Sequence, residues 1–181
     1  MKYVFISDLH GSAYAARFLP EIDGREQPEK IILLGDLLYH GPRNDLPREY
    51  DTKEVTKILN AMKTRFLCVR GNCDAEVDQM VLEFPIMADF MPLRLGSRTA
   101  FVTHGHLYNT ETLPPMNESD LLIHGHTHLK LCVPFGNDNF YLNPGSTSIP
   151  KDDDFGSYMV WEDGVFIWKK LDGTIVKEEK L

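Results

Sequence analysis

Short apolar runs alternate with more polar stretches along the first half of the chain. The runs 2–6, 30–34 and 65–69 are five residues long and mostly aliphatic or aromatic, which is typical of buried β-strands. Each run is followed by a segment with helical features. This strand–helix alternation favours a parallel α/β sheet, in which ligand sites lie beyond the carboxyl ends of the strands.

Capping residues and apolar spacing predict three helices, over 13–19, 51–63 and 74–82. Ser12 is a suitable N-cap for the first helix, and Pro20 is expected to end it. The second helix opens with an aspartate-based capping box and has one apolar face. The third is short and is expected to begin at an aspartate cap. These helices fall between and after the predicted strands.

The second half of the chain has the pattern of antiparallel β structure. The last three predicted strands are joined by Asp163-Gly164 and Asp172-Gly173, which are strong hairpin signals and predict a C-terminal β-meander. We therefore expect a single domain over residues 1–181, of α/β class, with two packed sheets and helices outside. The strands predicted in this half are 99–103, 120–123, 131–133, 140–142, 157–162, 165–171 and 174–177.

Composition narrows the class of protein. The chain is 43% hydrophobic and 25% charged, as in ordinary globular proteins. No apolar run reaches the roughly 18–20 residues of a membrane span, and no signal-peptide pattern is present. Three irregularly spaced cysteines predict a reduced, cytoplasmic protein rather than a disulfide framework. The net charge of −8 argues against nucleic acid as a partner.

Polar residues of metal-ligand type recur where the predicted strands end. The most prominent group is His124, His126 and His128, which alternate just after an apolar run. One polar residue at a strand end is usually a helix cap or a solubilising loop residue, but five strand ends in succession are difficult to explain in that way. The full set is Asp8, His10, Asp36, Asn72, His104, His126 and His128.

The chemistry of this set indicates a metal centre. Oxygen and imidazole ligands suit Mn, Fe, Zn or Co better than a structural zinc cluster, which favours cysteine. Asp36 is the natural bridge because its carboxylate has two oxygens. Two ions about 3.5–4 Å apart can clamp the attacking and leaving oxygens of a phosphoryl displacement.

The order of these motifs resembles that of calcineurin-like metallophosphoesterases, over residues 8 to 128. The resemblance implies a four-layer α/β/β/α sandwich of two mixed sheets flanked by helices. It also implies two divalent metal ions, most often Mn²⁺, with Zn²⁺, Fe²⁺ or Co²⁺ as alternatives. One ion would be held by Asp8, His10, Asp36 and His128, and the other by Asp36, Asn72, His104 and His126.

The resemblance further implies a phosphoric diester hydrolase that acts on a small phosphodiester through a metal-activated hydroxide. Arg43 and Asn44, on a long polar loop over 37–50, are candidates for substrate binding or for packing of that loop. Asp74 is expected to orient His10, His104 or another ligand without binding an ion itself. His106 is either a substitute acid or an exposed bystander, and His124 is not expected to be a ligand. The candidate catalytic residues are Asn72, Cys73, Asp74 and His104.

Cys73 departs from the family pattern, which has histidine at this position. A thiol has a reference pKa of about 8.5 and is a weak hydrogen-bond donor. Beside two cations it is expected to tend toward thiolate and to donate nothing. Loss of a general acid typically costs about 10²–10⁴ in rate, so we expect weak activity on monoesters. Alternatively, Cys73 is a buried filler or a redox-sensing thiol.

Two other functions fit parts of the sequence. A small eukaryotic relative with this fold acts as an interaction scaffold, but every metal position here carries a competent residue. A nuclease on single strands would share the chemistry, yet the acidic charge disfavours it. The sequence also allows a homo-oligomer, either a dimer or a tetramer. The residues Trp161, Phe166 and Trp168 would form its interface or, alternatively, belong to the core.

Overall fold

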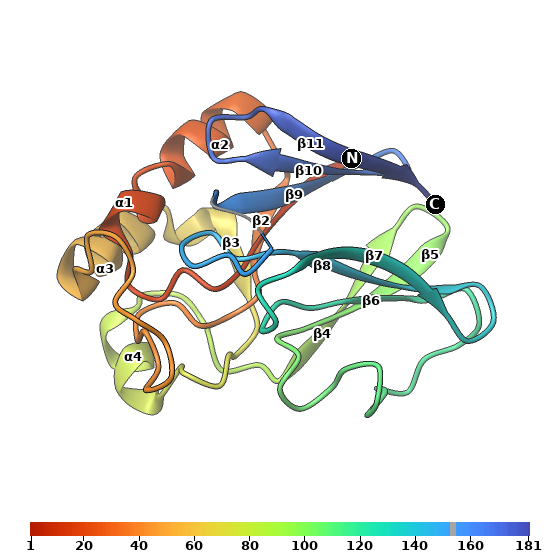
Figure 1. Cartoon of the computed structure of the whole chain (residues 1–181), viewed down its shortest axis with the longest axis horizontal. Coiled ribbons are helices and arrows are strands. Elements are labelled where there is room, and N and C mark those ends of the chain that lie inside the picture. The colour runs from red at the N-terminus through yellow and green to blue at the C-terminus, as the bar shows by residue number, and fades with distance from the viewer. Residues whose placement is uncertain (153–154) are drawn as a thin grey trace.

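A computed structural model describes residues 1–152 and 155–181, which form two mixed β-sheets stacked on each other (Figure 1). The six-stranded sheet contains, in spatial order, β11 (Ile175–Lys180), β10 (Val165–Lys170), β9 (Ser157–Glu162), β1 (Lys2–Ile6), β2 (Lys30–Leu33) and β3 (Phe66–Cys68). The five-stranded sheet contains β4 (Phe90–Leu95), β5 (Arg98–Thr103), β6 (Leu121–Ile123), β8 (Asn139–Pro144) and β7 (Lys130–Phe135).

Strand pairing confirms the predicted class. β1, β2 and β3 are parallel, whereas β9, β10 and β11 form an antiparallel meander. β9 pairs antiparallel with β1, so the meander extends the N-terminal sheet. In the other sheet, β6 is parallel to both β5 and β8. Both sheets are therefore mixed, as expected.

The helices follow the predicted positions with corrections. α1 (Ala13–Ala16) is capped by Ser12 but is short, and Pro20 lies in the first turn of α2 (Leu19–Glu26) instead of ending a helix. The first turn tolerates proline because its N–H groups have no partner within the helix. α3 (Thr52–Ala61) is capped by Asp51 as predicted, and a 3₁₀ turn follows it. α4 (Glu76–Val81) begins after Ala75, not after Asp74.

The central strands alternate their side chains between two cores. Val4 and Ile6 of β1 pack with the helices, whereas Phe5 packs between the two sheets. This two-sided burial explains why the sequence shows continuous apolar runs instead of alternation. Trp161 and Trp168 are 3% and 0% exposed and belong to the inter-sheet core, so they are core residues and not an interface.

The two outer faces of the stack differ. Residues of α1, α2 and α3 pack on the six-stranded sheet, and Figure 1 shows α1 and α2 on its outer side. Over the five-stranded sheet, the segment 104–120 contains no helix and places Tyr108 against Phe90 with ring centroids 5.7 Å apart. Within the described residues, the helical layer therefore covers one outer face, and irregular chain packs on the other. None of the helices within residues 1–152 and 155–181 is long and apolar enough to cross a membrane.

Candidate metal centre

The loops that follow the strands bring the seven predicted ligands together at one end of the sheet stack. Asp8, Asp36 and Asn72 follow the parallel strands β1, β2 and β3, while His104 follows β5. The predicted ligand atoms form two compact groups, each with its atoms within 4.8 Å of one another: Asp8, His10 and His128, and Asp36, His104 and His126. A third group, His10, Asp36 and Cys73, meets the same limit and shares one residue with each of them.

The first group directs lone pairs at a common point. Oδ1 of Asp8 lies 3.2 Å from Nε2 of His128 and 3.6 Å from Nε2 of His10. The two Nε2 atoms are 3.4 Å apart. Oδ1 of Asp8 is buried and has no hydrogen-bond partner among the described residues. A buried carboxylate oxygen in this position needs a cation or donor to offset its desolvation, so the group fits a divalent metal ion.

The second group is built around His104. Its Nε2 atom lies 3.4 Å from Oδ2 of Asp36, 3.1 Å from Oδ1 of Asn72 and 3.1 Å from Nδ1 of His126. Oδ2 of Asp36 is also 3.6 Å from Nε2 of His10. The Asp36 carboxylate therefore stands between the two groups, which is the position that a bridging ligand requires.

Backbone carbonyls fix three of the imidazoles. Nδ1 of His10 contacts the carbonyl of Tyr39, Nδ1 of His104 that of Leu34, and Nδ1 of His128 that of Ile149, at 2.7–2.8 Å. A carbonyl only accepts, so each Nδ1 carries the proton and donates it. Each Nε2 atom then faces the centre, which is the atom that a metal-binding histidine presents when its Nδ1–H is held by a carbonyl.

The local backbone is strained where the ligands lie. Five of the seven predicted ligands have φ between 48° and 66°, a region that residues other than glycine seldom adopt: Asp8, His10, Asp36, His126 and His128. Such strain gathers at functional sites. Gly71 and Gly125 permit close approach, because a Cβ at Gly71 would clash with the Asp36 carboxylate and one at Gly125 would clash with the Ser7 hydroxyl.

Comparison with known proteins identifies the family. Residues 1–163 match the calcineurin-like phosphoesterase superfamily domain. The chain belongs to the calcineurin-like phosphoesterase superfamily. The chain is 44% identical over 165 residues to phosphodiesterase YfcE of Escherichia coli strain K12, covering 91% of this chain and 89% of that protein.

Solved structures agree with this membership. A structure of YfcE, a phosphoesterase from E. coli, matches with a TM-score of 0.94 and 41% identity over 99% of both chains. The Zn²⁺ complex of Vps29 from Entamoeba histolytica matches with a TM-score of 0.62 and 21% identity, covering 100% of this chain and 98% of that one. The second likeness shows the fold alone. Calcineurin-like phosphoesterases include metal-dependent enzymes, and the two ligand groups fit divalent ions.

Charges at this phosphoesterase site balance each other. Burial acts to raise the pKa of Asp8, but the adjacent His10 and His128 imidazoles outweigh burial and hold the pKa well below its ordinary value. Burial acts to lower the pKa of His104, but the Asp36 carboxylate raises it to about 9. The two carboxylates thus stay anionic, as ligands must be.

Asp74 contacts the backbone of the calcineurin-like centre. The sequence predicts that it orients His10, His104 or another ligand, and its carboxylate accepts N–H groups from Asp36, Leu37 and Gly71 at 2.7–2.9 Å. Burial and then the Asp36 charge raise the pKa of Asp74, against these hydrogen bonds. Asp74 therefore fixes the backbone that carries Asp36.

Cys73 stands where most calcineurin-like phosphoesterases are expected to have histidine. Its backbone N–H donates to Oδ1 of Asp36 at 2.8 Å, and its Sγ accepts from the Asn72 amide at 3.3 Å. Burial and then the Asp36 carboxylate raise the pKa of the Cys73 thiol to about 12. The predicted thiolate would need the charge of bound ions to overcome these effects. Cys73 is half-buried and lines a cavity, which disfavours the filler interpretation.

A cavity of about 500 Å³, here called the metal-facing cavity, opens over the phosphoesterase centre. Arg43 and Asn44 line it, and the Asn44 amide donates to the carbonyl of His40 at 2.8 Å. Lys151 also lines it, and its backbone N–H donates to the carbonyl of His128 at 3.2 Å. Lys151 is not among the residues predicted from the sequence, because only the fold brings it beside a ligand. Its position shortly after an Asn-Pro-Gly-Ser turn was the available signal.

Two further histidines lie beside the ligands of this calcineurin-like site. His124 stacks on Tyr141 with ring centroids 4.1 Å apart and belongs to neither ligand group. His106 is half-buried, its ring centroid lies 5.4 Å from that of His104, and burial with the nearby His104 lowers the pKa of His106 to about 4. A neutral imidazole is a poor proton donor, so the structure favours the bystander interpretation of His106, although it is not fully exposed.

Proposed function

We propose that this protein hydrolyses small phosphodiesters at a centre of two divalent metal ions, with Mn²⁺ as the ion that supports activity. The observation that carries the proposal is the Asp36 carboxylate between two groups of converging ligand atoms, 3.6 Å from His10 and 3.4 Å from His104. The relative with 44% identity is a phosphodiesterase, which supports the same reaction for this chain.

In this proposal each ion has four protein ligands. Bound ions of this kind make a hydroxide available near neutral pH and stabilise negative charge on phosphoryl oxygens. The buried Asp8 oxygen without a protein partner supports the first set. Asp8, His10, Asp36 and His128 would hold one ion, and Asp36, Asn72, His104 and His126 the other.

The remaining residues of the site position the substrate. Arg43 and Lys151 line the metal-facing cavity and would attract the phosphate charge. Asn72 donates its amide toward Cys73 at 3.3 Å, so the same side chain can present its Oδ1 to an ion and its N–H₂ group to the cavity side. Asn44 holds the loop by its hydrogen bond to His40. These contacts fix orientation rather than transfer protons.

Cys73 is proposed to limit the enzyme to diesters with good leaving groups. A thiol with a raised pKa donates a proton poorly. Monoester dianions and poor leaving groups depend most on a proton donor, and the lack of one typically costs about 10²–10⁴ in rate. Weak monoesterase activity is the expected consequence.

The test is hydrolysis of an aryl phosphodiester and the matching monoester by metal-stripped protein, before and after Mn²⁺ is added. We expect metal-dependent turnover of the diester, and a gain of about tenfold or more on the monoester in Cys73→His. Cys73→Ser is the matched control, because a hydroxyl does not supply the missing acid. No turnover of either ester despite two bound ions per chain would contradict the proposal and favour the scaffold interpretation.

Three further expectations accompany the proposal. A single domain over 1–181 is supported by the pairing of β9 with β1, which joins the two ends of the chain in one sheet. A cytoplasmic location is consistent with three free cysteines. A dimer or tetramer stays a prediction, and light scattering of the purified protein tests it.

A further inference from the structure

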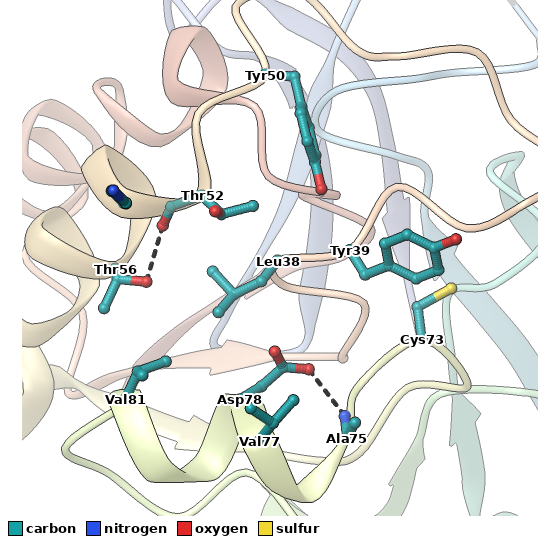
Figure 2. Close-up of a pocket in the computed structure, with 11 residues that line it drawn as sticks. Leu38, Tyr39, Tyr50, Thr52, Thr56, Cys73, Ala75, Val77, Asp78 and Val81 are labelled. Carbon is teal, nitrogen blue, oxygen red and sulfur yellow. Dashed lines mark hydrogen bonds between the residues drawn. The ribbon is translucent and has the colours of Figure 1, made fainter.

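A second hollow, here called the side cavity, lies next to the metal-facing cavity. Its volume is about 630 Å³, within the usual range of about 300–1,000 Å³ for small-molecule sites. Tyr39 and Leu38 line it from the loop after β2, Tyr50 from the end of that loop before α3, and Val77 and Val81 from α4. Figure 2 shows Tyr50 on one side and α4 on the opposite side. The side cavity is therefore large enough for an aromatic ring.

Cys73 joins the side cavity to the candidate metal centre. It lines both cavities, and its backbone N–H donates to the Asp36 carboxylate at 2.8 Å. Tyr39 lies on the same side of the cavity as Cys73 (Figure 2). The backbone carbonyl of Tyr39 accepts a hydrogen bond from Nδ1–H of His10 at 2.8 Å. The backbones of two wall residues, Cys73 and Tyr39, are thus hydrogen-bonded to two predicted metal ligands. A phosphodiester at the centre would have the side cavity within reach of one of its ester groups.

The polar groups of the wall are largely used within the helices. The Asp78 carboxylate accepts the N–H of Ala75, and the Thr56 hydroxyl donates to the carbonyl of Thr52, both at 2.8 Å (Figure 2). Lys53 and Asp78 both line the cavity, so its charged side chains are one cation and one anion. An anionic occupant, such as a second phosphate, gains little from this lining.

The remaining wall is aliphatic and aromatic. Val77 and Val81 are 63% and 47% exposed, and Tyr39 is 43% exposed. Leu38 forms the floor between them and Tyr50. Apolar side chains left in water on a concave wall favour an apolar ligand that covers them.

We propose that the side cavity binds an uncharged, ring-sized apolar group of the phosphodiester, so that the preferred substrates carry one aryl, benzyl or similar ester group. This inference rests on the proposed function, because it takes the phosphorus to be held at the metal centre. It adds the class of the organic group, which the ligand residues do not define.

The test compares two singly charged phosphonate esters, methyl methylphosphonate and benzyl methylphosphonate. Their alkoxide leaving groups are poor, so both act as ligands and not as substrates. Titration calorimetry with the Mn²⁺-loaded protein measures each affinity directly. We expect the benzyl ester to bind about tenfold more tightly, because its ring buries several more carbon atoms. Equal affinities in the native protein would overturn the inference.

Two variants on α4 assign the preference to the side cavity. Val77→Asp places a charge on its wall and is expected to reduce the ratio of the two affinities to near one. Met80→Asp is the matched control, since Met80 is 83% exposed on the same helix and does not line the cavity. Tyr39→Ala gives a second test from a different element and is expected to reduce the ratio also. A ratio that survives both Val77→Asp and Tyr39→Ala would contradict the inference.

The readouts separate this inference from the proposed function. A benzyl preference that depends on Val77, in a protein that hydrolyses no diester, would keep the side cavity and reject the proposed reaction. Diester hydrolysis without any benzyl preference would keep the proposed reaction and reject the side cavity as a binding site. Light scattering tests the other occupant, a second copy of the chain. A native dimer that both Val77→Asp and Met80→Asp dissociate, with no benzyl preference, would assign this face to self-association and overturn the inference.

Discussion

Oδ2 of Asp36 lies 3.6 Å from Nε2 of His10 and 3.4 Å from Nε2 of His104, so one carboxylate contacts both ligand groups. Asp36→Asn keeps the side-chain shape but removes the charge that two cations would share. We expect loss of at least one ion per chain and a fall in diester turnover on the order of a thousandfold. Metal content by mass spectrometry and steady-state rates with Mn²⁺ check this.

Asp45→Asn is the control for that variant, because Asp45 is exposed on the same loop and does not line the metal-facing cavity. It is expected to retain both ions and full activity. Two bound ions and native turnover in Asp36→Asn would reject the bridging role.

Among individual residues, the sequence predicted most of the side chains that converge in the two groups, but not the contacts of the residues that support them. Strand ends in a parallel sheet converge, so Asp8 and Asp36 are expected to be neighbours once the strands are recognised. The role of Asp74 was not accessible in this way, because its partners are backbone N–H groups from two loops. Backbone contacts of this kind depend on φ and ψ angles, and side-chain identity does not reveal them.

The N-cap of α3 sets the stability of the helix that carries Thr52, Lys53 and Thr56 to the side cavity. Oδ1 of Asp51 accepts N–H groups from Lys53 and Glu54, both at 3.1 Å. Asp51→Ala leaves these donors to water and is expected to cost about 1 kcal/mol, which lowers the melting temperature by about 2–4 °C. Calorimetry compares it with Asp45→Ala, an exposed change that removes no cap. Equal melting temperatures for the two variants would show that the cap contributes nothing.

Element boundaries were predictable where capping chemistry is strong and not where proline is ambiguous. Asp51 was identified correctly, but Pro20 lies in the first turn of a helix rather than ending one. β4 was missed because it contains Pro92, which usually argues against a strand. β4 is an edge strand, where proline is tolerated. The alternation of Met91, Leu93 and Leu95 before Gly96 was the signal for it.

Sheet pairing connects the two ends of the chain, and this level of organisation was only partly predictable. The hairpin signals predicted the meander, but they did not indicate that β9 pairs with β1. β9 is buried on both faces, since its neighbouring residues Val160 and Trp161 face different cores. Burial on both faces removes the period-two pattern from the sequence, so the partner strand can be identified only from the packed structure.

A buried ionic cluster links the helical layer to the meander and makes acid stability a property of the whole molecule. Glu26 of α2 is 4% exposed and accepts the Tyr158 hydroxyl of β9 at 2.7 Å. Its two oxygens also accept the Lys169 ammonium of β10 at 2.9 and 3.0 Å. Burial acts to raise the pKa of Glu26, but Lys169 and then Tyr158 outweigh it, so the pKa lies below its ordinary value.

A carboxylate with a lowered pKa in the folded state stabilises the fold above its unfolded pKa of about 4.3, and this contribution disappears as pH falls through the folded pKa. Glu26→Gln is therefore expected to lower the free energy of unfolding by about 2 kcal/mol at pH 7. The difference from the native protein should persist to about pH 5 and shrink below the unfolded pKa. Urea unfolding at pH 7, 5 and 3.5 measures it. Glu21→Gln, exposed on the same helix, is the control and should show no comparable loss. A Glu26→Gln deficit that is the same at all three pH values would mean that lost packing, and not the charge of Glu26, is responsible.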